Sequence, residues 1–147
     1  MTEKSQTTDE AQIRALIDKR VNAVRAKDVD AAMANVAADI LSFDVVGPLQ
    51  QTGSAASRKR AEEWFASFEG AIGLEISQLN ITTSDDVAFC HGLNHVSATR
   101  ADGGKLDMWW RATICFQKFA GRWMVTHEHN SVPFDPENGK ASLDLKP

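Results

Sequence analysis

In the last third of the chain, residues 106–131 form two runs that a short loop separates. Along each run, the character of the side chains repeats at every second residue. Successive side chains of a β-strand point to opposite faces, so this period of two predicts the two strands of a hairpin. One face of the first strand would carry Asp107, Trp109, Arg111, Thr113 and Cys115. One face of the second strand would carry Trp123, Val125, His127, His129 and Ser131. Polar groups framed by tryptophans are typical of small-molecule sites, which combine apolar walls with a few placed polar groups.

The loop decides which residues of the hairpin face each other. Residues 119–121, Phe-Ala-Gly, fit a three-residue loop with the glycine in a left-handed bulge. This loop pairs Thr113 with His127 and Arg111 with His129. A two-residue Ala-Gly loop is the alternative, and it would shift the register by one and move Arg111 to the other face. Because alanine disfavours the positive φ that the shorter loop requires, the sequence favours the bulge.

Composition narrows the class of protein. A chain of 147 residues fits one domain, and its net charge of −4 argues against a general nucleic-acid binder. No apolar run approaches the roughly 18 residues of a membrane-spanning helix, and the polar N-terminus lacks the apolar core of an export signal. Cys90 and Cys115 lack metal-ligand spacing, as expected of free thiols in a reducing cytoplasm. We therefore expect a cytoplasmic protein with neither a nucleic-acid nor a membrane partner.

The remaining patterns place helices first and strands afterwards. The expected organisation is a disordered lead, a single domain and a C-terminal tail, over residues 1–8, 9–135 and 136–147. Apolar spacing and capping residues, with Thr8 or Asp9 as the first cap, predict three helices over residues 9–27, 31–37 and 55–69. Strands are expected over residues 40–46, 74–81 and 87–99, before the hairpin. This order is typical of an α+β fold with helices on one face of a sheet.

Three segments within this pattern carry a resemblance to a known family. They are Ser-Phe-Asp-Val-Val at 42–46, Glu-Glu-Trp-Phe at 62–65, and Gly-Arg-Trp-Met-Val-Thr-His-Glu-His-Asn-Ser-Val-Pro at 121–133. With the two N-terminal helices, they make the chain resemble the nuclear-transport-factor-2-like (NTF2-like) superfamily over residues 9–135. Within it, the chain is most similar to the SnoaL-like and ketosteroid-isomerase-like small proteins. The resemblance implies a cone-shaped, curved antiparallel sheet with three helices on its concave face, a pocket between them, and a homodimer formed through the outer sheet face.

The ketosteroid isomerases offer one chemical expectation for this chain. They use an Asp base with a Tyr and a protonated Asp as donors to an oxyanion. Asp44 follows the first β-run and is the candidate base, and Asp107 at the head of the hairpin is the candidate neutral acid. The chain contains no tyrosine, so a literal steroid isomerase is not expected, although His or Trp N–H groups could replace the phenol. The alternative for Asp44 is a strand-end residue that caps nearby amides.

The hairpin supplies the other candidate groups. Arg111 next to His129 would favour a neutral imidazole that accepts a proton, with the structural polar pair as the alternative. His127 and His129 could suggest a metal site, but spacing identifies no third ligand, so neither a metal nor a cofactor is expected. The expected catalytic residues are Asp44, Arg111, His127 and His129. The expected ligand-binding residues are Trp64, Phe68, His91, Asp107, Trp109, Thr113 and Ser131.

Two functions from different classes follow. The first is acid/base chemistry (isomerisation, dehydration or cyclisation) on a hydrophobic carbonyl compound, with Asp44 or His129 as base and Arg111 as oxyanion donor. Arg111 would also suit a carboxylate-bearing ligand, which it could hold with two hydrogen bonds. The second is a non-catalytic domain of the same fold, used for ligand binding or dimerisation.

Overall fold

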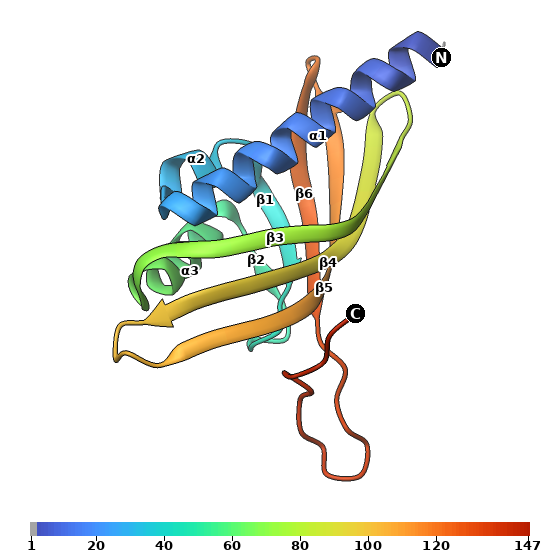
Figure 1. Cartoon of the computed structure of the whole chain (residues 1–147). Coiled ribbons are helices and arrows are strands. Elements are labelled where there is room, and N and C mark those ends of the chain that lie inside the picture. The colour runs from blue at the N-terminus through green and yellow to red at the C-terminus, as the bar shows by residue number, and fades with distance from the viewer. Residues whose placement is uncertain (1–2) are drawn as a thin grey trace.

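The protein is a six-stranded curved sheet with three helices (Figure 1). The computed structural model describes residues 3–147, with side chains from residue 8 onward. The helices are α1 (Glu3–Ala26), α2 (Val29–Met33) and α3 (Ser54–Ala66). The strands are β1 (Val36–Phe43), β2 (Gln51–Thr52), β3 (Phe68–Thr83), β4 (Val87–Arg100), β5 (Lys105–Phe119) and β6 (Arg122–Ser131). The α+β class expected from the sequence is confirmed.

The strands form one sheet in the order β2-β1-β6-β5-β4-β3. Neighbours β3 to β6 are antiparallel, as expected for consecutive hairpins, while β1 lies parallel to β6. The strands β3, β4 and β5 bend strongly, and the sheet stays open rather than closing into a barrel (Figure 1). Helix α1 runs across the concave face, and α2 and α3 sit at one end of it (Figure 1). All three helices therefore lie on the concave side of the sheet (Figure 1).

The first helix begins earlier than the sequence patterns predicted. It starts at Glu3, so Asp9 lies inside α1 and is not its cap. The Asp9 side chain is buried and its Oδ1 accepts hydrogen bonds from Lys118 Nζ at 2.8 Å and Trp123 Nε1 at 3.3 Å. Asp9 therefore ties α1 to the far end of the hairpin. The second helix is capped by Asp28, whose Oδ1 accepts from the amide of Ala31 at 3.1 Å.

Two apolar clusters hold the layers together. The larger lies under α1 and consists of Ile13, Ile17, Ile40, Ala88, Cys90, Phe116, Trp123 and Val125. The smaller lies under α3 and consists of Phe65, Phe68, Ile72 and Val96. Both clusters use the concave face of the sheet, so the helices cover that face alone. Among residues 3–147, no helix covers the opposite face (Figure 1), which carries side chains such as Phe89 and Trp109.

The register of the hairpin differs from the predicted one. Phe119 pairs with Arg122, so the loop has two residues, Ala120 at φ 50° and Gly121 at φ 78°. The three-residue loop predicted from the sequence is therefore wrong. A two-residue loop with positive φ at both positions matches the twist of the flanking strands, and this outweighs the cost of a left-handed alanine.

A β-bulge in β6 then restores the pairing of faces that the two-residue loop alone would have reversed. The register shifts opposite Cys115 and Phe116, so that Phe116 pairs with Val125 but Cys115 pairs with His127. Beyond the bulge Thr113 pairs with His129, and Arg111 is on the same face as both. The bulge also separates two halves of β6: Trp123 and Val125 point into the core, whereas His127 and His129 point outward.

Candidate functional site

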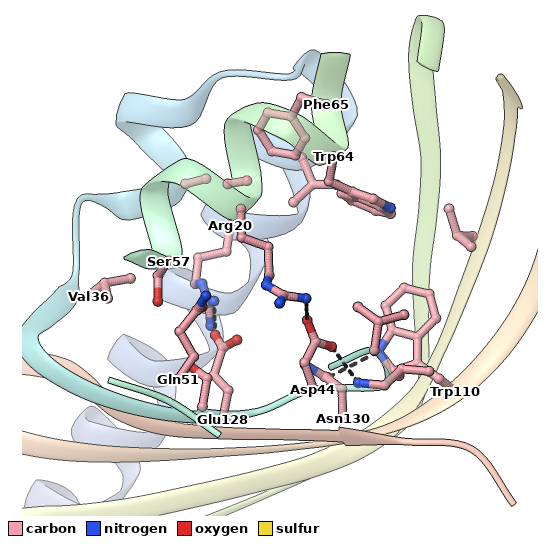
Figure 2. A pocket seen from close by; sticks show the side chains of 18 of the residues that line it. Arg20, Val36, Asp44, Gln51, Ser57, Trp64, Phe65, Trp110, Glu128 and Asn130 are labelled. Atoms are coloured by element: carbon pink, nitrogen blue, oxygen red, sulfur yellow. Dashed lines mark hydrogen bonds and ion pairs between the residues drawn. The ribbon is translucent and has the colours of Figure 1, made fainter. Parts of the chain in front are cut away.

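A cavity of about 370 Å³ lies between the concave face of the sheet and the helices. Most of its wall is apolar, and Figure 2 shows Trp64 and Phe65 of α3 on one side and Trp110 of β5 on another. Its apolar lining residues include Val24, Ala32, Val36, Ile40, Val46, Val96, Leu106 and Met108. Volume and lining are those of a site for a small organic molecule.

A carboxylate and a guanidinium lie at the exposed rim of this cavity. Asp44 follows β1, and its Oδ2 accepts from Arg60 Nη1 of α3 at 3.1 Å (Figure 2). Asp44 Oδ1 accepts from the amide of Val45 at 2.7 Å, and Arg60 Nη2 donates to the carbonyl of Gly47 at 2.8 Å. The Asp44 side chain is 33% exposed, so a ligand in the cavity has access to it. Asp44 therefore lines the cavity and also accepts from the next amide, the contact that the strand-end alternative expects.

A second ion pair crosses the cavity from helix to sheet. Arg20 of α1 pairs through Nη2 with Glu128 Oε1 of β6, and Figure 2 shows both side chains within the lining. Their side chains are 23% and 22% exposed, so the pair is more buried than the one at the rim. The two opposite charges neutralise each other. This pairing matters for stability, because an unpaired charge at this depth would cost several kcal/mol.

An indole and two asparagine amides add to the polar lining, which also includes Ser42, Gln51 and Ser57. Trp110 Nε1 donates to Asn130 Oδ1 at 3.1 Å (Figure 2). This bond uses the amide oxygen of Asn130, and the amide nitrogen has two hydrogens to donate to a ligand. A side lobe of about 170 Å³ adjoins the main cavity beneath α1. The residues lining both spaces are Arg20, Val24, Trp64, Trp110, Glu128 and Asn130. Asn94 of β4 lines the side lobe.

Of the residues singled out from the sequence, the structure brings Asp44 and Trp64 to the cavity. Phe68 packs edge-on against Trp64 with ring centroids 5.2 Å apart, and it belongs to the core behind the cavity wall. Eight other residues line neither space: His91, Asp107, Trp109, Arg111, Thr113, His127, His129 and Ser131. The expectation that these eight share a cavity is corrected. Alternation along β5 gives two faces, and the helices cover the one that carries Trp110, Ala112, Ile114 and Phe116.

The eight residues instead belong to the outer sheet face. With their neighbours they make a surface that we call the outer face, composed of Phe43, Phe89, His91, Leu93, His95, Asp107, Trp109, Arg111, Thr113, Cys115, His127, His129 and Ser131. Arg111 Nε donates to Ser131 Oγ at 3.1 Å, and the rings of His95 and Trp109 stack at 4.4 Å. His95 also pairs with Asp107 at 3.0 Å. All four histidines of the chain lie on this face.

Nothing in the structure indicates a metal site or a reactive thiol. Among residues 3–147, no three His, Cys, Asp or Glu side chains are grouped as metal ligands would be. Over the same residues, no helix is both long and apolar enough to cross a membrane. Burial raises the pKa of the Cys90 thiol to about 11, although the Arg20 guanidinium acts in the opposite direction. Burial also raises the pKa of Cys115. Both thiols therefore stay protonated and poorly nucleophilic at neutral pH.

This arrangement, a cone of sheet and helices around a pocket, defines the NTF2-like class of domain. A model of the SnoaL-like domain matches residues 13–135. An NTF2-like protein of unknown function from Pseudomonas putida KT2440 is 36% identical, with 96% of this chain and 98% of that chain covered and a TM-score of 0.87. The chain therefore belongs to the SnoaL-like domain family of the NTF2-like superfamily.

Two more distant structures share the fold. A candidate dehydratase of the NTF2-like family from Streptomyces avermitilis is 14% identical, covers 86% of this chain and 97% of its own, and has a TM-score of 0.75. The association domain of CaMKII from C. elegans is also 14% identical, covers 88% of this chain and 100% of its own, and has a TM-score of 0.69. None of the curated proteins matches the chain.

Proposed function

We propose that the protein binds a hydrophobic carbonyl compound in the main cavity and moves a proton on it. The observation that carries the proposal is the Asp44 carboxylate at the rim of a largely apolar cavity. Within the part of the chain that the structure describes, two acidic residues line the cavity, Asp44 and Glu128. Each carboxylate pairs with an arginine, Asp44 with Arg60 and Glu128 with Arg20, and Asp44 is the better base because it is the more exposed of the two.

The geometry supports a simple mechanism. Asp44 would take a proton from the carbon next to the carbonyl, and the electron pair of that C–H bond would move into an enolate. The amide nitrogen of Asn130 would donate to the enolate oxygen, because its own oxygen is already held by Trp110. Arg60 would position Asp44 and then stabilise it after the proton leaves for another carbon or for water. Isomerisation and dehydration both begin with this step, and the fold is shared with a candidate dehydratase.

The proposal is tested with a naphthyl methyl ketone as probe. The chain has four tryptophans and no tyrosine, and Trp64 and Trp110 line the cavity, so binding should quench the protein's fluorescence saturably. In deuterium oxide, the protein should accelerate exchange of the methyl protons next to the carbonyl, measured by proton NMR. Absence of both quenching and accelerated exchange would contradict the proposal.

We also infer that the protein self-associates through the outer face. This face is rich in aromatic side chains and Phe89 is 43% exposed, while the helices cover only the opposite side of the sheet. A sheet with apolar side chains on both faces needs cover on both. The fold is shared with an association domain, that of CaMKII from C. elegans. A second copy of the chain, packed sheet against sheet, would bury this face.

Phe89→Lys is expected to weaken such a dimer by about 100-fold, because two new cations would lie within one interface. Light scattering across a concentration series measures the change. Leu49→Lys is the matched control, since Leu49 is 96% exposed but lies in the loop between β1 and β2, away from the outer face. A wild-type protein that is monomeric at micromolar concentration, or equal effects of both variants, would contradict this interface.

A further inference from the structure

We infer that the side lobe is a second binding site that selects the ligand, and that it takes an uncharged hydroxyl group at the end of the molecule remote from its carbonyl. The inference rests on the proposed function, because it assumes that the main cavity binds the carbonyl compound. It adds the class of ligand: a hydrophobic carbonyl compound with a distal hydroxyl.

The two spaces form a path for one elongated molecule. The side lobe shares six lining residues with the main cavity, so the spaces adjoin at Trp64, Trp110 and the Arg20–Glu128 pair. Asp44 lines the main cavity alone, and Asn94 lines the side lobe alone. A molecule whose carbonyl end reaches Asp44 therefore has its other end available for the side lobe.

The charges of the side lobe favour a neutral group. Its only charged lining residues in the described part of the chain are Arg20 and Glu128, which pair with each other. A carboxylate or ammonium on the ligand would have to break this pair and would leave one charge without a partner. Such an uncompensated charge costs several kcal/mol. A neutral end group avoids this cost.

An unpaired amide explains why the end group should be polar. Asn94 Oδ1 is buried and has no hydrogen-bond partner among the described residues. Asn94 faces Trp110 across the β4–β5 ladder, and Asn130 lies on the far side of that indole. A buried acceptor without a donor costs roughly 1–3 kcal/mol. The terminal torsion of an asparagine is broad, so a small rotation would turn the oxygen toward the lobe.

A hydroxyl satisfies the Asn94 amide better than other neutral groups of its size. Its hydrogen would be donated to Asn94 Oδ1, and its oxygen would accept from the amide nitrogen of the same side chain. The other polar groups of the lobe are already paired, Arg20 with Glu128 and Trp110 with Asn130, and the remaining wall is apolar, with Ile17, Val21, Leu74, Ile76 and Ile114 in it. The unpaired oxygen of Asn94 beside this apolar wall is the arrangement that discriminates a hydroxylated ligand from its parent.

The test compares two probes on three proteins. The probes are the naphthyl methyl ketone and the same ketone with a hydroxyl on its distal ring, and binding is measured by tryptophan fluorescence. Wild-type protein should bind the hydroxylated ketone about tenfold more tightly than the parent. Asn94→Leu should abolish this preference, because the hydroxyl would lose its hydrogen-bond partner in the lobe. Asn80→Leu, the same change at an exposed position of β3 that lines neither space, should keep the preference.

The outcomes separate the inference from the proposed function. Equal binding of the two ketones to wild type, or a preference that survives in Asn94→Leu, overturns the inference while binding of the parent ketone still supports the proposed function. If neither ketone binds, both fail. Should Asn94→Leu not fold, Asn94→Ala removes the same amide without adding volume, and the same two results decide.

Discussion

Replacing Glu128 with leucine should lower the free energy of unfolding by about 2–3 kcal/mol, since Arg20 would keep its charge at a mostly buried position without a partner. Fully buried pairs that lose one member lose about 3–5 kcal/mol. The cavity beside Arg20 admits water, so the smaller range applies. Urea denaturation of the variant and of wild type measures the difference.

The double variant Arg20→Leu, Glu128→Leu should recover at least half of that loss. Removing both charges removes the desolvation cost along with the attraction, and the new side chains would face apolar neighbours of the side lobe. The exposed pair of Arg14 and Glu10 on the same helix is the control, with nitrogen and oxygen 3.5 Å apart and side chains about half exposed. Glu10→Leu should change stability by less than about 0.5 kcal/mol. Equal losses at the two pairs would show that burial of the Arg20–Glu128 pair has no energetic consequence.

The period of the side chains predicted most of the fold. Alternation from residue 74 onward indicated the long strands, and apolar spacing indicated the helices, because both patterns follow directly from backbone geometry. Side-chain periodicity could not predict the parallel pairing of β1 with β6. It joins segments more than eighty residues apart, and no local pattern encodes such a contact. The two-residue strand β2 is too short to have a period.

The same periodicity could not say which face of the hairpin turns toward the helices. Both faces of β5 carry a tryptophan, Trp109 on one and Trp110 on the other. Side chains of similar size and apolarity on both faces leave the choice to tertiary packing. In the structure the face with Trp110 turns inward, and the polar groups of the other face lie outside the cavity. Most of the candidate site was therefore predicted on the wrong side of the sheet.

A local signal for the charged residues of the cavity is present in the sequence. Arg20 occupies a helical position in register with Ile13, Ile17 and Val24, all of which face the interior. A charged residue within an apolar helix face needs a partner or a ligand inside the protein. Glu128 could be identified as that partner only once the bulge in β6 was known, because the bulge turns Glu128 inward and its two histidine neighbours outward.

Asp44→Asn should reduce proton exchange on the ketone probe by about 10²- to 10⁴-fold, the usual contribution of a positioned general base. Asparagine has nearly the same shape but cannot accept the proton. Its amide would also present hydrogens to Arg60, so the pair that positions the side chain would be weakened. Exchange followed by proton NMR under saturating probe measures the loss of the chemical step separately from binding.

Two further measurements assign that loss to the base. Binding of the probe to Asp44→Asn should stay within a few-fold of wild type, because the cavity wall is unchanged. The free energy of unfolding should change by less than about 1 kcal/mol, as the ion pair is one-third exposed. Asp39→Asn, at an exposed position of β1, the strand that precedes Asp44, should leave exchange unaltered. If Asp44→Asn retained full exchange while Glu128→Gln lost it, the base would be Glu128, and Arg20 rather than Arg60 would be the cation that positions it.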